Sequence, residues 1–370
     1  MRRKIFALLL AGALCAGLAA CGGQGAQETQ EETAAAADAA AETDAAASEG
    51  AAAGTEEAGA ADADAAETTG SGKVTVYMPS PAGLADKLAA AFTEKTGIQV
   101  EQFQGTTGEI LARLETEEAN PVADVVILAS WSDGLSMKES GQIMSYTPAD
   151  ADKVNEGWID EDNMLFGYSA SAVGVIYNTT IYPELSADWA DLAGADYTDD
   201  IAIPDPEKSG ACKDFLAGMV TGLDNGEEIM QSWADNGLTV PGANSAALES
   251  VTTGEKGILI AGVDYNAYSS MADGEPLAIY YPASGTVVNP RPAMIMNTAP
   301  NADNAKAFID FLFSDEAQQM VAEAYLLPGR SDIQCEGRTN LADIPQLPTD
   351  WTAMMDVADD TAAHLNEICQ

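Results

Sequence analysis

Basic side chains are scarce in this sequence. Only 16 Lys and Arg residues stand against 59 Asp and Glu residues in a chain of 370, and the formal net charge at pH 7 is −43. A field this negative repels phosphate backbones and anionic lipid headgroups, and it keeps a protein soluble. The composition therefore excludes nucleic acid as a partner.

Side chains that catalyse reactions are also few. The single histidine, His364, lies near the C-terminus among alanines. The sequence contains no G-x-S-x-G elbow, no phosphate-binding P-loop and no H-E-x-x-H zinc motif. Because acid–base and nucleophilic catalysis need an activated group with a partner beside it, we expect no enzyme activity and no cofactor.

The chain has only five cysteines. Cys212 follows a Ser-Gly-Ala turn at a predicted helix start, where the pKa of a thiol can fall, so a thiol nucleophile is the best enzyme hypothesis. The favoured alternative is a small buried side chain. Cys335 and Cys369 suit a disulfide in an extracytoplasmic compartment, and the sequence leaves that pairing open.

The first 20 residues are typical of an export signal. Arg2, Arg3 and Lys4 precede an apolar run that is too short to span a membrane comfortably. The run ends in "LAAC", which resembles the bacterial lipobox, in which the cysteine is lipidated; here that residue is Cys21. We therefore expect a lipoprotein signal and a membrane-anchored, extracytoplasmic protein, with an ordinary secretory signal as the alternative.

Residues 21–72 lack the side chains that build a core. Beyond Cys21 the stretch has no aromatic residue and no Lys or Arg, and it consists mainly of Ala, Glu, Asp, Thr and Gly. Such a segment cannot bury enough apolar surface to offset its ordering entropy. The composition predicts a disordered acidic tether.

From Lys73 onward, strand and helix patterns alternate. Residues 73–78 and 98–103 have strand patterns, and residues 81–97 and 105–121 have helical spacing. Residues 123–130 contain an unbroken apolar run typical of a buried strand. The same alternation continues after residue 172. It predicts an α/β fold with a parallel, doubly wound sheet.

Three stretches carry a family resemblance: "KTGIQVE", "EANPVADVV" and "AKAFIDFLFSDEAQ". Together they resemble the extracellular solute-binding proteins of ABC importers, in the group that includes ferric-iron and 2-aminoethylphosphonate binders. The resemblance implies a type II periplasmic-binding-protein fold, a small-molecule ligand, an ABC permease as partner and a monomer. It also implies the domains: lobe one at 73–166 plus 285–330, lobe two at 167–284 and a C-terminal extension at 331–370.

Two predicted helix starts suit an anion. One contains Thr106 and Thr107, and the other contains Ser209, Gly210 and Ala211. Free N–H groups and hydroxyls at helix N-termini hold oxyanions without Lys or Arg. The resemblance implies that the Ser-Gly-Ala turn holds an anion, while the alternative is that these residues only cap their helices.

The resemblance also places a ligand pair at Asp264 and Tyr265. Ferric-binding relatives carry two adjacent tyrosines there, and this sequence has replaced one phenol with a carboxylate. We expect an anionic or zwitterionic solute, such as an aminophosphonate or organophosphate, with an ammonium group facing Asp264. Ferric iron held by this pair with a synergistic anion is the alternative. The remaining predicted ligand contacts are Ser80, Ser130, Trp131 and Asn244.

Overall fold

The computed structural model describes residues 72–370. The predicted signal peptide, the lipidated Cys21 and nearly all of the predicted tether lie outside the described residues and stay predictions. The strands are β1 Lys73–Met78, β2 Gln99–Gln104, β3 Val125–Ile127, β4 Ile143–Met144, β5 Phe166–Asn178, β6 Ile201–Ala202, β7 Ile258–Val263, β8 Leu277–Tyr280, β9 Val288–Met296 and β10 Leu327–Pro328.

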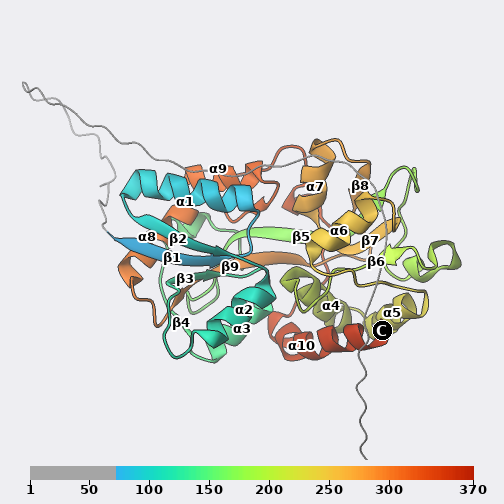
Figure 1. The fold of residues 1–370 in the computed structure, drawn as a ribbon, viewed down its shortest axis with the longest axis horizontal. Coiled ribbons are helices and arrows are strands. Elements are labelled where there is room, and N and C mark those ends of the chain that lie inside the picture. Colours follow the sequence, from blue (N-terminus) through green and yellow to red (C-terminus); the bar gives the residue numbers. More distant parts are fainter. Residues whose placement is uncertain (1–71) are drawn as a thin grey trace, which may run out of the picture. The chain divides into compact units, whose positions relative to one another are not determined.

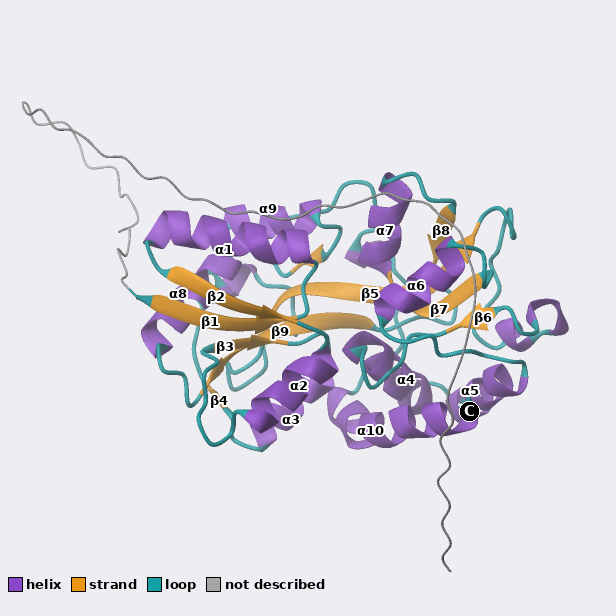
Figure 2. Cartoon of the chain, in the orientation of Figure 1, coloured by secondary structure: helices purple, strands orange, loops and turns teal. Residues whose placement is uncertain are grey.

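The helices account for most of the remaining regular structure. They are α1 Ala82–Thr96, α2 Thr107–Thr116, α3 Trp131–Glu139, α4 Gly210–Gly222, α5 Gly226–Asp235, α6 Asn244–Thr252, α7 Asp264–Ala272, α8 Ala302–Leu312, α9 Asp315–Glu323 and α10 Trp351–Ile368. Helices lie on both sides of the strands (Figure 2). The α/β class expected from the sequence is therefore confirmed.

Two long strands connect the two halves of the described fold. The strand order is β2-β1-β3-β9-β5-β7-β6, and β5 and β9 run between the two groups of helices and strands (Figure 1). The first part of β5 pairs with β9 and β10, and its last part pairs with β7 and β8. We call the elements β1–β3, α1–α3, α8 and α9 the first lobe, and the elements β6–β8 and α4–α7 the second lobe.

The sheet is mixed rather than parallel throughout. β1, β2 and β3 are parallel, and so are β6 and β7, as the sequence pattern predicts. The connecting strands β5 and β9 are antiparallel to each other and to their other neighbours. The expectation of an all-parallel sheet is wrong at these strands, because their continuous burial hides the direction in which they run.

Local signals set the boundaries of the early elements. Leu84, Leu88 and Phe92 lie on one face of α1 and are almost fully buried. The helix ends at Gly97, whose φ of 76° suits a residue without a Cβ atom. Phe92 then packs against Phe308 of α8 with a ring-centroid separation of 5.1 Å. This contact joins the N-terminal strand–helix unit to a helix from the far end of the chain.

The C-terminal extension reaches both lobes. Its first part forms a bridge between Gln346 and Thr286, which precedes β9. Its helix α10 packs mainly on α4 and also contacts α3, where the rings of Trp351 and Trp131 lie 6.3 Å apart. Residues 331–370 are thus an integral part of the fold rather than a loose tail.

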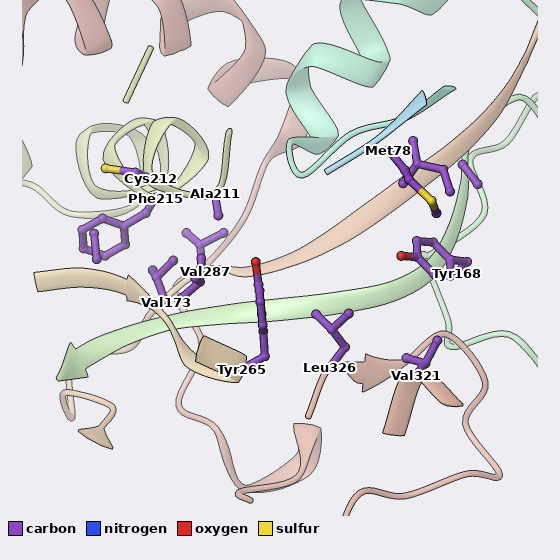
Figure 3. Close-up of a cluster of buried hydrophobic side chains, with 14 of the residues drawn as sticks. Met78, Tyr168, Val173, Ala211, Cys212, Phe215, Tyr265, Val287, Val321 and Leu326 are labelled. Carbon is purple, nitrogen blue, oxygen red and sulfur yellow. The ribbon is translucent and has the colours of Figure 1, made fainter. Parts of the chain in front are cut away.

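The three cysteines of the described residues are free thiols. Cys335 donates its thiol hydrogen to the carbonyl of Leu326, and no Cys335–Cys369 bond is present within residues 72–370. Cys212 is fully buried on α4 beside Phe215, and Val173 and Val287 belong to the same buried cluster (Figure 3). Its thiol donates to the carbonyl of Pro204, and burial raises the pKa of the thiol well above its ordinary value. The Cys212 side chain is therefore a core residue and a poor nucleophile.

Candidate functional site

Four helices begin at one cavity. The cavity has a volume of about 320 Å³. Residues at the starts of α2, α4, α6 and α7 line it; they are Thr106, Thr107, Ser209, Gly210, Ala243, Asn244, Ser245, Val263, Tyr265 and Asn266. Because the first N–H groups of a helix lack partners within the helix and carry partial positive charge, the arrangement favours a ligand with negative charge.

Capping side chains satisfy part of these starts. Thr106 and Glu109 form a reciprocal capping box at α2. The Ser209 hydroxyl oxygen accepts from the backbone N–H of Cys212 at 3.3 Å, and the same hydroxyl donates to the Asn244 side chain at 3.0 Å. At α6, by contrast, Ala243 supplies no capping side chain. The alternative that these residues only cap their helices therefore holds in part, and uncapped N–H groups remain at the cavity.

A buried arginine forms part of the cavity wall. Arg291 lies in β9 and is 1 % exposed. One terminal nitrogen donates to the carbonyl of Pro79 at 2.6 Å, and the Nε–H has no hydrogen-bond partner. Among the ion pairs of residues 72–370, none involves Arg291. A buried guanidinium without a carboxylate is costly, so its place in the wall is a second, independent sign of an anionic ligand.

Tyr265 faces the same guanidinium. The guanidinium carbon of Arg291 lies 5.7 Å from the centre of the Tyr265 ring. Burial raises the pKa of the Tyr265 phenol, and the Arg291 charge offsets part of that rise. The phenol is therefore protonated at neutral pH and available as a hydrogen-bond donor.

Asp264 does not line the cavity. Its carboxylate is fully buried and forms an ion pair with Arg338 of the C-terminal extension. The same carboxylate accepts from the Tyr281 hydroxyl at 3.0 Å and from the Ala172 N–H at 3.1 Å. Burial raises the pKa of Asp264, and Arg338 lowers it. Asp264 is expected from the sequence to face a ligand. In the structure, its carboxylate is instead paired with Arg338, which is distant in sequence.

Three other predicted contacts also lie away from the cavity lining. The Ser130 hydroxyl donates to Asp214 at 3.0 Å, and the Trp131 N–H donates to the same carboxylate at 2.7 Å. Ala211 is buried behind the start of α4, where its carbonyl accepts from Asn289. The predicted residues that do line the cavity are Ser80, Thr106, Thr107, Ser209, Gly210, Asn244 and Tyr265.

The pair predicted to bind iron is not brought together in the described residues. The predicted pair is divided, because Tyr265 lines the cavity while Asp264 is paired with Arg338. Within residues 72–370, no group of three or more His, Cys, Asp or Glu side chains is placed to hold a metal ion. The Arg291 charge beside Tyr265 further disfavours a trivalent cation.

The two lobes touch at the rim of the cavity. A Cβ atom added to Gly108 of α2 would lie 2.4 Å from the carbonyl oxygen of Glu207, which precedes α4. A Cβ atom added to Gly210 would lie 2.7 Å from the Cβ atom of Ser130. Glycine is thus required at both positions by the close approach of one lobe to the other at the rim of the cavity.

Comparison with solved structures identifies the type of fold. The periplasmic binding protein AfuA of Actinobacillus pleuropneumoniae, solved with exogenous fructose-6-phosphate bound, superimposes with a TM-score of 0.72 at 20 % identity. That match covers 80 % of this chain and 97 % of AfuA. The two-lobed type II periplasmic-binding-protein fold expected from the sequence is confirmed.

Sequence comparison then identifies the family. The family model "Bacterial extracellular solute-binding protein" matches residues 120–352, and the chain belongs to this family. Iron uptake protein A1 of Synechocystis sp. is 28 % identical over 71 % of this chain and 77 % of its own length. A putative 2-aminoethylphosphonate-binding periplasmic protein of Salmonella paratyphi A is 26 % identical over 66 % and 73 %. The chain is thus a solute-binding component of the ABC transporter type, the family whose ligands are small molecules and whose partners are ABC permeases.

The described residues contain no helix that is long and apolar enough to cross a membrane.

Proposed function

We propose that this protein captures a small oxyanion, such as an organophosphate or a phosphonate, and delivers it to an ABC permease. The observation that carries the proposal is the convergence of four helix N-termini on one cavity. The wall of this cavity contains the buried Arg291, which has no carboxylate partner and whose Nε–H has no hydrogen-bond partner. Together they supply a full positive charge and several N–H donors without an opposing carboxylate at the arginine. The binding step is closure of the two lobes over the ligand, with no covalent chemistry.

The ligand class follows from the charges of the cavity. Lys208 and Arg291 line it, and the carboxylate in the lining is Glu109 at the exposed start of α2. A phosphoryl group would meet Arg291 and the N–H groups of α4 and α6. For an aminophosphonate, Glu109 rather than Asp264 is then the carboxylate that faces the ammonium group. The names of the relatives, which refer to iron uptake and aminophosphonate binding, are compatible with a site of this kind but do not choose among ligands.

We also propose that the protein is a monomer anchored to a membrane surface through a lipid on Cys21, with residues 22–72 as the tether. Support comes from the apolar run ending in "LAAC" and from the composition of the following stretch. Metabolic labelling with a fatty-acid analogue tests the anchor. Labelling of the wild type that disappears in Cys21→Ser is expected, and equal labelling of both would contradict it.

A thermal-shift titration of the full chain tests the ligand class. The probes are inorganic phosphate, 2-aminoethylphosphonate, glucose 6-phosphate and ferric citrate. A ligand at one hundred times its Kd stabilises the folded state by about 2.7 kcal/mol. We expect a shift with at least one phosphoryl probe and none with ferric citrate.

Arg291→Gln separates this site from a general charge effect. The charged hydrogen bond that is lost is worth about 1.5–3 kcal/mol, so affinity for the phosphoryl probe should fall roughly tenfold to a hundredfold. Arg113→Gln is the matched control, because it removes the same charge from the partly exposed face of α2, where Arg113 pairs with Glu117. A shift with iron alone, or equal affinity of Arg291→Gln and wild type, would reject the oxyanion site.

A further inference from the structure

A second contact between the lobes lies outside the ligand cavity, where α3 meets α4. Asp214 of α4 is fully buried and accepts three hydrogen bonds from the start of α3. Its carboxylate accepts from the Ser130 hydroxyl at 3.0 Å, from the Ser132 hydroxyl, and from the Trp131 N–H at 2.7 Å. A carboxylate of the second lobe thus caps a helix of the first lobe, and the contact exists only while the lobes are together.

The charges around this contact do not balance. Lys213 of α4 is 8 % exposed and pairs with Asp133 of α3 and, at 3.1 Å, with Asp359 of α10. Two carboxylates, those of Asp133 and Asp359, share this ammonium group, and the neighbouring Asp214 carboxylate forms no ion pair of its own. Within residues 72–370, no other cation forms an ion pair with these carboxylates. Asp133 is itself 9 % exposed, and its second oxygen lacks a hydrogen-bond partner.

This excess of buried negative charge is costly, because a low-dielectric environment disfavours charged forms and neighbouring carboxylates repel one another. Burial, reinforced by the charge of Asp133, raises the pKa of Asp214 to about 7. The hydroxyl of Ser132, the ammonium of Lys213 and the hydroxyl of Ser130 oppose the rise without cancelling it. Asp359 is largely solvated and is paired with Lys213.

We propose that closure of the two lobes takes up a proton from solvent, at most one per molecule, at the carboxyl group of Asp214. The proton is accommodated within the contact, because the hydroxyl oxygens of Ser130 and Ser132 can accept from a protonated carboxyl while the Trp131 N–H still donates to its other oxygen. The proposal rests on the hinge closure of the proposed function. It assigns to Asp214 a role in conformation, since the residue does not line the ligand cavity.

The direction of the pH effect follows from the two states of Asp214. When the lobes part, Asp214 gains water and loses Asp133 as a neighbour, so its pKa falls toward the ordinary value of about 3.9. The closed state therefore binds the proton more tightly than the open state. Between about pH 7 and pH 4, closure becomes more favourable as the pH falls, by at most tenfold per pH unit, and above pH 7 the linkage disappears.

The first experiment needs no ligand. Small-angle X-ray scattering of the full chain between pH 8 and pH 5.5 reports how compact the two lobes are. We compare the wild type with Asp214→Asn, in which a neutral amide replaces the titrating carboxyl group. Asp235→Asn is the control, because it removes an exposed carboxylate from α5 of the same lobe.

The expected result is a wild-type radius of gyration that decreases as the pH falls through 7, a control with the same profile, and an Asp214→Asn variant whose radius is independent of pH. Identical profiles for the wild type and Asp214→Asn, whether flat or sloping, would overturn the proposal. If Asp214→Asn does not fold, Ser132→Ala takes its place. That variant removes a donor to the charged carboxylate, and its midpoint should move to higher pH; an unmoved midpoint would also overturn the proposal.

Proton uptake provides a second and independent reading. Calorimetric titration with a phosphoryl probe at pH 6.5, in two buffers of different ionisation enthalpy, counts the protons taken up. The wild type should take up more protons than Asp214→Asn, and equal counts argue against the linkage. A pH-dependent radius without any binding of phosphoryl probes would leave the linkage standing and reject the proposed ligand instead.

Discussion

Replacing Gly108 with alanine should hold the lobes apart by a single methyl group. The added Cβ atom would lie 2.4 Å from the carbonyl oxygen of Glu207 in the second lobe. Carbon atoms in favourable contact lie about 3.5 Å or more from their neighbours, so the lobes would have to separate locally by about 1 Å. Overpacking of this kind costs about 1–3 kcal/mol, which corresponds to a loss of roughly fivefold to a hundredfold in ligand affinity.

The same substitution should not weaken the ligand-free protein. Gly108 lies in the first turn of α2, where alanine is the better helix former by roughly 0.5–1 kcal/mol, and an open arrangement relieves the contact with Glu207. The unfolding temperature without ligand should therefore stay level or rise while affinity falls. Calorimetric titration with the phosphoryl probe that stabilises the wild type measures the affinity, and a melting curve measures the stability.

Gly83→Ala is the matched control for this prediction. Gly83 lies in α1 with no heavy atom within 4 Å of the added Cβ position, so the variant should show the helix gain alone and bind with wild-type affinity. The reasoning fails if Gly108→Ala binds as tightly as Gly83→Ala. It also fails if Gly108→Ala lowers both the ligand affinity and the unfolding temperature of the ligand-free protein.

Two further predictions concern the buried interior. Arg338→Met leaves the Asp264 carboxylate buried without its cation and should lower the free energy of unfolding, measured in urea, by about 3–5 kcal/mol. The double variant Asp264→Asn with Arg338→Met should lose clearly less than the sum of the two single losses. Additive losses would contradict the ion pair. Cys212 should resist iodoacetamide at pH 8 in the native protein, because its thiol is fully buried and its pKa is raised, and stoichiometric labelling before unfolding would contradict that burial.

Local patterns predicted the parts of the site that depend on neighbouring residues. Thr106 and Ser209 were recognisable as helix starts, because a small hydroxyl residue before a helical pattern accepts from the N–H groups that follow it. Asn244 was also recognisable from its place before a predicted helix, whereas the expectation that Ser80 and Tyr265 meet a ligand followed from the family resemblance.

Other parts of the site depend on residues that are distant in the chain. Arg291 was missed because one cation in an apolar strand has no periodic signal, although an arginine between two prolines in a buried strand is unusual enough to draw attention. The ion pair of Asp264 has no local signal in the sequence, because its partner Arg338 lies 74 residues further on. Ser130 and Trp131 were assigned to the ligand, and only the packing of α4 against α3 places them against Asp214.

The position of β9 between β3 and β5 has a consequence for the order in which the chain can fold. The carboxylate of Asp124, beside β3, accepts a hydrogen bond from the backbone N–H of Asn301, a residue 177 positions later. Strand β9 pairs with both β3 and β5 and so joins the two parts of the sheet. A growing polypeptide therefore reaches its first complete sheet only after most of the residues have been made. Such long-range pairing slows folding, so the complete sheet forms late relative to the local strand and helix units that precede it in the chain.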